Sequence, residues 1–116
     1  MHCNLKSLEQ YNDTQFVIKA IYKGEQSEAV MLYLLPGQEM PTHPHRQFEV
    51  TLLPRSGTAT LTVNDNKSVE LKPDVLYYER PGSTFRLLNT GSVPFEVLIT
   101  LVRVNPRETP PIDPQT

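Results

Sequence analysis

The sequence predicts an all-β fold of the sandwich or barrel type, on three observations. Short runs of β-prone residues recur at close spacing, clusters of Pro, Gly, Asn and Asp separate these runs, and no convincing helix remains. A chain of 116 residues has the size of one domain, which can bury a sizeable core without disulfides or a structural metal. We therefore expect a single β-domain over residues 1–104.

The predicted strands follow one another along the chain, and most of them end at a recognisable turn. Their ranges are 15–22, 29–35, 48–53, 59–63, 68–71, 75–79, 84–88 and 95–104. The sequence Asn64-Asp65-Asn66 closes a hairpin between two of them, because these residues tolerate positive φ. Further reversals are predicted at 72–74, 80–83 and 89–92, where Pro, Gly, Asn and Ser accumulate.

The last predicted strand is apolar on both of its faces apart from Glu96 and Thr100. A strand of this kind needs cover on its outer side, either from a second layer of the same chain or from a partner subunit. An apolar outer sheet face is a common way to build a dimer, so we expect a homodimer. The proline-rich tail 105–116 cannot fold alone and is expected to be disordered or to lie in extended form over a neighbour.

The charge and the termini exclude several classes of protein. The net charge of −2 and the absence of a basic patch interleaved with aromatics argue against nucleic-acid binding. A lone Cys3 fits a reducing compartment, the N-terminus lacks the apolar run of a signal peptide, and no stretch is long enough to span a bilayer. The expected location is the cytoplasm, without membrane association.

Three candidate metal ligands stand close together in the sequence, at His43, His45 and Glu49. Their offsets are even, so on one extended strand all three side chains point to the same side. The β-prone residues that follow favour this geometry over a helix, which would split the group. The alternative is a polar surface turn ahead of a strand.

The segment 37–57 resembles the first conserved motif of the cupin superfamily, which runs Gly, five residues, His-x-His, three or four residues, Glu, six residues, Gly. Gly37 and the three candidate ligands fit this pattern without adjustment. The closing Gly57 follows Glu49 after seven residues rather than six, with Pro54 in the interval, which predicts a bulge or a longer turn.

A second cupin motif, Gly, five residues, Pro-x-Gly, two residues, His, three residues, Asn, is half retained. Gly82, Phe85 and Asn89 keep its second half, but Phe85 stands where the family has its fourth metal ligand, a histidine. The opening glycine is missing, and Pro81 is adjacent to Gly82 instead of two positions before it. The resemblance covers about 29–104 and implies a double-stranded β-helix, or jelly-roll barrel, with its site inside the mouth.

This resemblance implies one divalent transition metal, Fe, Mn, Zn, Ni or Cu, held by His43, His45 and Glu49 with open positions for water or substrate. Phe85 either leaves an apolar wall beside the metal or marks a site that has lost it. Gln47 shares the parity of the three ligands and is a candidate pocket residue, as is Tyr77; the alternatives are exposure for Gln47 and sheet surface or core for Tyr77.

Two functions follow from these expectations. The first is a small metal-dependent enzyme, an oxygenase, isomerase or lyase acting on a small oxygenated molecule. The second is a barrel that binds or senses a small molecule without turnover, metal-free because Phe85 replaces the fourth ligand. A structural or storage role has little support in so short a chain.

Overall fold

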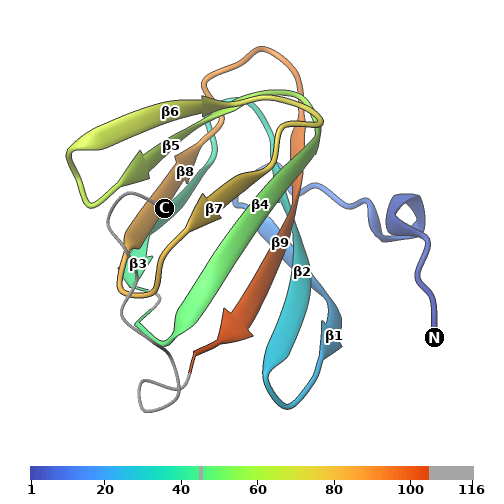
Figure 1. Cartoon of the computed structure of the whole chain (residues 1–116). Helices are drawn as coiled ribbons and strands as arrows, with labels where there is room; N and C mark the ends of the chain where they lie inside the picture. Colours follow the sequence, from blue (N-terminus) through green and yellow to red (C-terminus); the bar gives the residue numbers. More distant parts are fainter. Residues whose placement is uncertain (45, 105–116) are drawn as a thin grey trace.

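Nine β-strands in two antiparallel sheets make up the described part of this computed structural model, which covers residues 1–44 and 46–104, with the backbone alone at 42–44. Figure 1 shows the two sheets stacked with their strands around a common interior. The strands are β1 Val17–Lys23, β2 Ser27–Leu34, β3 Glu39–Pro44, β4 Phe48–Ser56, β5 Ala59–Val63, β6 Lys67–Leu71, β7 Tyr77–Glu79, β8 Thr84–Leu88 and β9 Phe95–Arg103. A short 3-10 helix, η1 Leu5–Leu8, precedes them.

The order of the strands within the sheets joins segments that lie far apart in the sequence. One sheet has the order β1-β2-β9-β4-β7, and the other has the order β3-β8-β5-β6. The last strand, β9, lies between β2 and β4 at the centre of the larger sheet, as Figure 1 shows. These two antiparallel sheets confirm the predicted all-β jelly-roll class.

Turn chemistry explains the best-predicted boundaries. Strands β5 and β8 have the predicted bounds, and the turn after β5 places Asn64 at φ 52° and Asp65 at φ 60°. The Asn64 side chain also accepts a hydrogen bond from the Thr84 backbone N–H at 3.0 Å, which ties this turn to the start of β8. The predicted bulge is present too, since the pairing of β4 with β9 shifts between Pro54 and Ser56.

Two elements were not predicted. Strand β3 contains Pro41 and Pro44, which argue against a central strand, but it lies at the edge of its sheet, where proline is tolerated. The helix η1 buries none of its residues and begins at Asn4, whose side chain accepts from the Lys6 backbone N–H. The N-terminal end of the chain, with η1, extends away from the barrel in Figure 1. The tail 105–116 lies outside the described residues.

The core lies between the two sheets, and buried residues alternate with less buried ones along β4 and β9. In β4, Val50, Leu52 and Pro54 are buried, whereas their neighbours Glu49 and Thr51 are only partly so. Apolar residues of β9 and β2 on the same face of the sheet complete this core. Burial of these side chains at roughly 25 cal/mol per Å² of apolar surface is the main stabilising contribution.

One end of the barrel is closed by tight packing. Gly57 has φ +77°, and a Cβ atom there would come within 2.3 Å of the Pro94 carbonyl oxygen, so only glycine fits. Asn89, which is 1% exposed, donates from Nδ2 to the carbonyls of Leu34 and Val93 at 2.9 Å each. These contacts join the ends of β2, β4 and β8 to the start of β9.

Candidate ligand cavity

A cavity of about 180 Å³ lies between the two sheets, toward the end opposite Gly57. It lies where β2 and β8 begin and β9 ends, and this is the lower end of the barrel in Figure 1. The described residues that line it are Ile18, Glu28, Val30, Met40, Val50, Leu52, Phe85, Leu87, Ile99 and Leu101. Nine of these ten side chains are apolar, and the exception is Glu28, so the cavity favours hydrocarbon over polar ligands.

Aromatic and basic groups border the lower end of the barrel. The guanidinium carbon of Arg103 lies 5.2 Å from the centre of the Phe48 ring, a cation–π distance. Arg103 Nη1 also donates to Gln47 Oε1 at 3.0 Å, and the Val104 N–H donates to the Gln47 carbonyl at 2.8 Å. Gln47 is therefore an exposed residue that holds the end of β9, and it does not line the cavity.

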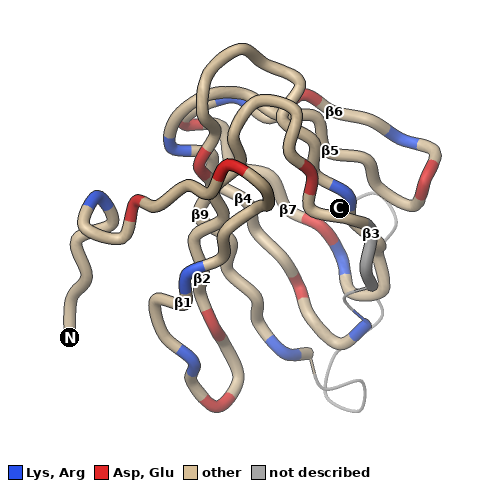
Figure 2. Tube along the Cα trace, turned by 180° about the vertical axis from the view of Figure 1, so that it is seen from behind, with Lys and Arg blue, Asp and Glu red and all other residues tan. Residues whose placement is uncertain are grey.

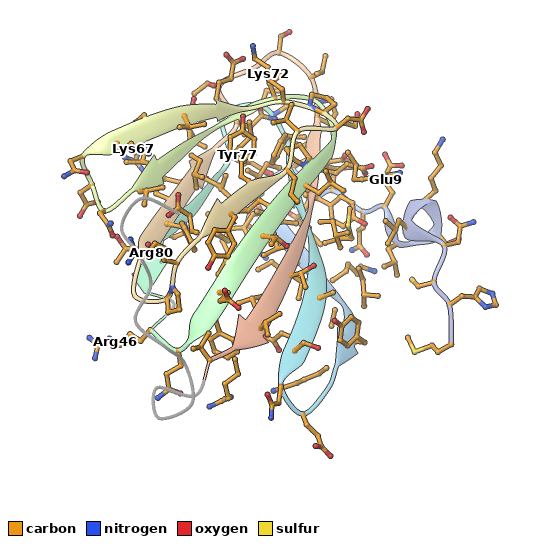
Figure 3. The ribbon with its side chains drawn as sticks, in the orientation of Figure 1. Glu9, Arg46, Lys67, Lys72, Tyr77 and Arg80 are labelled. Carbon is orange, nitrogen blue, oxygen red and sulfur yellow. The ribbon has the colours of Figure 1, made fainter. Side chains whose placement is uncertain are left out.

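The other two predicted pocket residues both point inward. Phe85, which is 1% exposed, forms part of the cavity wall. Tyr77 packs against the core from β7, and its hydroxyl donates to the Glu70 carbonyl at 2.7 Å. Figure 3 shows Tyr77 within the body of the barrel, whereas Arg46 extends away from it. Tyr77 is thus a core residue beside the cavity rather than a part of its lining.

Glu49 lies on the outer face of β4. Its neighbour Val50, at 1% exposure, is the residue that lines the cavity. The Glu49 carboxylate instead accepts a hydrogen bond of 2.7 Å from the hydroxyl of Tyr78 on the adjacent strand β7. This hydrogen bond raises the pKa of Tyr78, with smaller effects from partial burial and the Glu49 charge.

The expectation that one extended strand carries all three candidate ligands is wrong. His43 belongs to β3 and Glu49 to β4, which lie in different sheets, and the chain turns at Arg46 and Gln47 between them. The backbone of His43 is paired with Phe85. The side chain of His43 and the whole of His45 lie outside what the structure describes.

The residues that face the interior fit a metal centre poorly. Val50 is the position separated from Gly57 by the six intervening residues that the first cupin motif requires, and four residues also separate it from His45. Val50 and Phe85 thus occupy two inward positions at which the motifs have metal ligands, and neither can donate an electron pair. Among the described side chains, no group of three or more His, Cys, Asp or Glu is placed to hold a metal ion. A cation would depend on the two histidines.

A second polar cluster lies on the outer face of the larger sheet. Tyr33 is fully buried there, and its ring meets that of Tyr11 edge-on at a centroid distance of 5.4 Å. Burial, reinforced by the charge of Glu96, raises the pKa of both tyrosines to about 12. Burial likewise raises the pKa of Glu96, followed by the charge of Glu9. These groups sit on the wall opposite the cavity and do not reach it.

The remaining predictions concern surfaces. Acidic and basic positions are interspersed over the strands and turns in Figure 2. In the described part of the chain, none of the helices has the length and apolar character needed to cross a membrane. Exposed apolar side chains include Leu76, Tyr78 and Val102, which no described residue covers, and the homodimer stays a prediction.

Comparison with known proteins supports this architecture. A family model described as "Cupin domain" matches residues 30–101. A protein of Thermus thermophilus is 20% identical over 90% of this chain and 98% of its own, with a TM-score of 0.82. An uncharacterized double-stranded beta-helix protein of Klebsiella pneumoniae gives 20% identity, 90% coverage of both chains and a TM-score of 0.83. An RmlC-like cupin protein of Desulfovibrio desulfuricans is 17% identical over 88% of this chain and 95% of its own, with a TM-score of 0.79.

No curated protein matches the sequence significantly. At the identities of the solved structures, the likeness concerns the fold and not the activity. The family model, however, spans more than half of the chain and includes both motif regions. The chain therefore belongs to the cupin family.

Proposed function

We propose that this cupin is a binding protein that holds a small, mainly apolar organic molecule inside its barrel. The observation that carries the proposal is the lining of the cavity, with Val50 and Phe85 at two positions where the motifs have metal ligands. Hydrocarbon side chains favour an apolar ligand by desolvation, and a cavity of about 180 Å³ limits its size.

The size of the ligand follows from a known case. An engineered apolar cavity of about 150 Å³, lined by Leu, Ile and Phe, stays dry and binds benzene. The present cavity is slightly larger and has a similar lining. A single six-membered ring with one short substituent is therefore the expected scale of the ligand.

The metal-dependent enzyme is the competing proposal, and it depends on His43 and His45. The two imidazoles would hold the cation, with water or substrate completing its coordination, and the bound cation would supply Lewis-acid or redox chemistry. In this arrangement Glu49 contributes nothing from the outer face, because its carboxylate is bound to Tyr78. The substitution Glu49→Gln should then leave the metal content unchanged.

The experiment that separates these proposals is a titration of chelator-treated protein with benzyl alcohol, followed by NMR. We expect shifts of the methyl resonances of Val50 and Leu87, because both side chains line the cavity. The variant Val50→Phe fills part of the cavity and should abolish the shifts. The variant Leu53→Phe adds the same ring on the outer face of β4 and should retain them.

Two results would overturn the binding proposal. One is the absence of any binding to the cavity, with Val50→Phe behaving like the unmodified protein. The other is elemental analysis that finds one transition metal per chain and its loss in Glu49→Gln. That second result would restore the predicted metal site and the enzyme hypothesis with it.

A further inference from the structure

Glu28 is a carboxylate on the inner face of the larger sheet. It pairs in register with Leu101, an inward residue of β9 that is 8% exposed, and it precedes the cavity residue Val30 by two positions. Alternation along β2 therefore directs its side chain to the interior, together with Val30 and Leu32. Among the described residues that line the cavity, Glu28 alone is charged.

Within the described part of the chain, the Glu28 side chain forms no hydrogen bond and no ion pair. Two basic residues lie near it. Lys23 is the cross-strand neighbour of Glu28 on β1, and it is exposed. Its ammonium nitrogen lies more than 4 Å from the Glu28 carboxylate, because the one ion pair found among the described residues joins Arg86 and Glu39. Arg103 is held by Gln47 and the Phe48 ring.

An unpaired carboxylate beside hydrocarbon walls loses part of its hydration without gaining a partner. A ligand that places a cation beside the Glu28 carboxylate offsets the lost hydration, because charge-assisted hydrogen bonds between an ammonium and a carboxylate are stronger than those between neutral groups. A neutral ligand gives a smaller gain, and an anion adds repulsion. The negative charge of Glu28 thus selects among ligands that share one hydrocarbon shape.

We propose that the cavity selects a small organic amine, with its hydrocarbon part between Val50, Phe85 and Leu87 and its ammonium group at Glu28. This inference rests on the proposed binding function and specifies its ligand class. Both sheets contribute to the recognition, because β2 and β4 of the larger sheet supply Glu28 and Val50, while β8 of the smaller sheet supplies Phe85 and Leu87.

Three probes of one shape test the inference, namely benzylamine, benzyl alcohol and benzoate, each titrated into the full chain at neutral pH and moderate salt. We expect benzylamine to bind at least about tenfold more tightly than benzyl alcohol, and benzoate to bind most weakly. The variant Glu28→Gln should remove the advantage of benzylamine over benzyl alcohol. Its thermal unfolding midpoint checks that the barrel remains folded.

Glu25→Gln is the matched control. Glu25 lies in the turn between β1 and β2, is exposed and does not line the cavity, and its substitution changes the net charge by the same amount. It should keep the order of the three affinities. This control separates contact with the ligand from the overall field of the protein.

The outcomes distinguish the inference from the function on which it rests. If benzylamine and benzyl alcohol bind equally to the unmodified protein, or if benzoate binds best, the amine specificity is overturned while the binding function stands. Equal affinities would also be the result if Lys23 neutralised Glu28. If none of the three probes binds, both the specificity and the binding function fail.

Discussion

Two carboxylates on opposite faces of the larger sheet, Glu49 and Glu28, differ in whether they have a hydrogen-bond partner. On the outer face, the Glu49 carboxylate has a hydroxyl partner in Tyr78, and Glu96 lies opposite Tyr33. On the inner face, Glu28 has no such partner within the described residues and borders an apolar cavity. The face of the strand on which a carboxylate lies, more than the type of residue, therefore decides whether it remains available to a ligand.

The difference between the two faces is clearest in β4, where adjacent side chains point to opposite faces of the sheet. The first test is Leu52→Ala on the inner face against Leu53→Ala on the outer face. Leu52 is 1% exposed, so its truncation should lower the free energy of unfolding by about 2–5 kcal/mol, whereas the partly exposed Leu53 should cost about 1 kcal/mol or less. Urea unfolding measures both values. Equal losses would mean that the outer face is as well packed as the core.

A second test concerns the outer cluster, where Tyr33 carries a buried hydroxyl with no hydrogen-bond partner among the described residues. Leaving such a group unsatisfied costs about 1–3 kcal/mol, so Tyr33→Phe should raise stability by about 1 kcal/mol. The edge-on contact with Tyr11 is retained in the variant. Tyr11→Phe, at a partly exposed ring, is the control and should change little. A loss of stability in Tyr33→Phe would reveal a partner for this hydroxyl.

The smallest expected effect comes from Glu96. Because burial raises its pKa in the folded state, folding favours the protonated form, so its stabilising contribution is present below the usual pKa of 4.5 and is lost as the pH rises through the folded value. Glu96→Gln should therefore be more stable than the unmodified protein at pH 7, by less than about 1 kcal/mol, and should lose this advantage near pH 4. Thermal unfolding at the two pH values measures the difference. An exposed control, Glu70→Gln, should show no such gain at pH 7.

Much of the fold could be predicted from the sequence because its turns carry strong local signals. Asn64 and Asp65 adopt positive φ, as their side chains allow, and β5 and β8 begin and end as expected. Strand β3 was missed for a physical reason, since proline excludes a central strand but not an edge strand, and edge position depends on distant pairing with β8. No local pattern contains that information.

The candidate site was predicted less well than the fold. The even offsets of His43 and Glu49 suggested one shared face, but this argument assumed a continuous strand, and the chain turns and changes sheets between them. The sequence did contain a signal for which residues of β4 face the interior. Phe48, Val50 and Leu52 form an apolar alternation, which places Glu49 on the other face, and the extra residue before Gly57 points to the same assignment.

The tight contact at Gly57 has a consequence for redesign of this barrel. With the Pro94 carbonyl so near, the loops at that end cannot be lengthened or exchanged independently of one another. The β1–β2 hairpin and the β7–β8 loop lie at the other end, where new segments can be grafted without disturbing this junction. Loop libraries intended to alter ligand choice should therefore be confined to that open end.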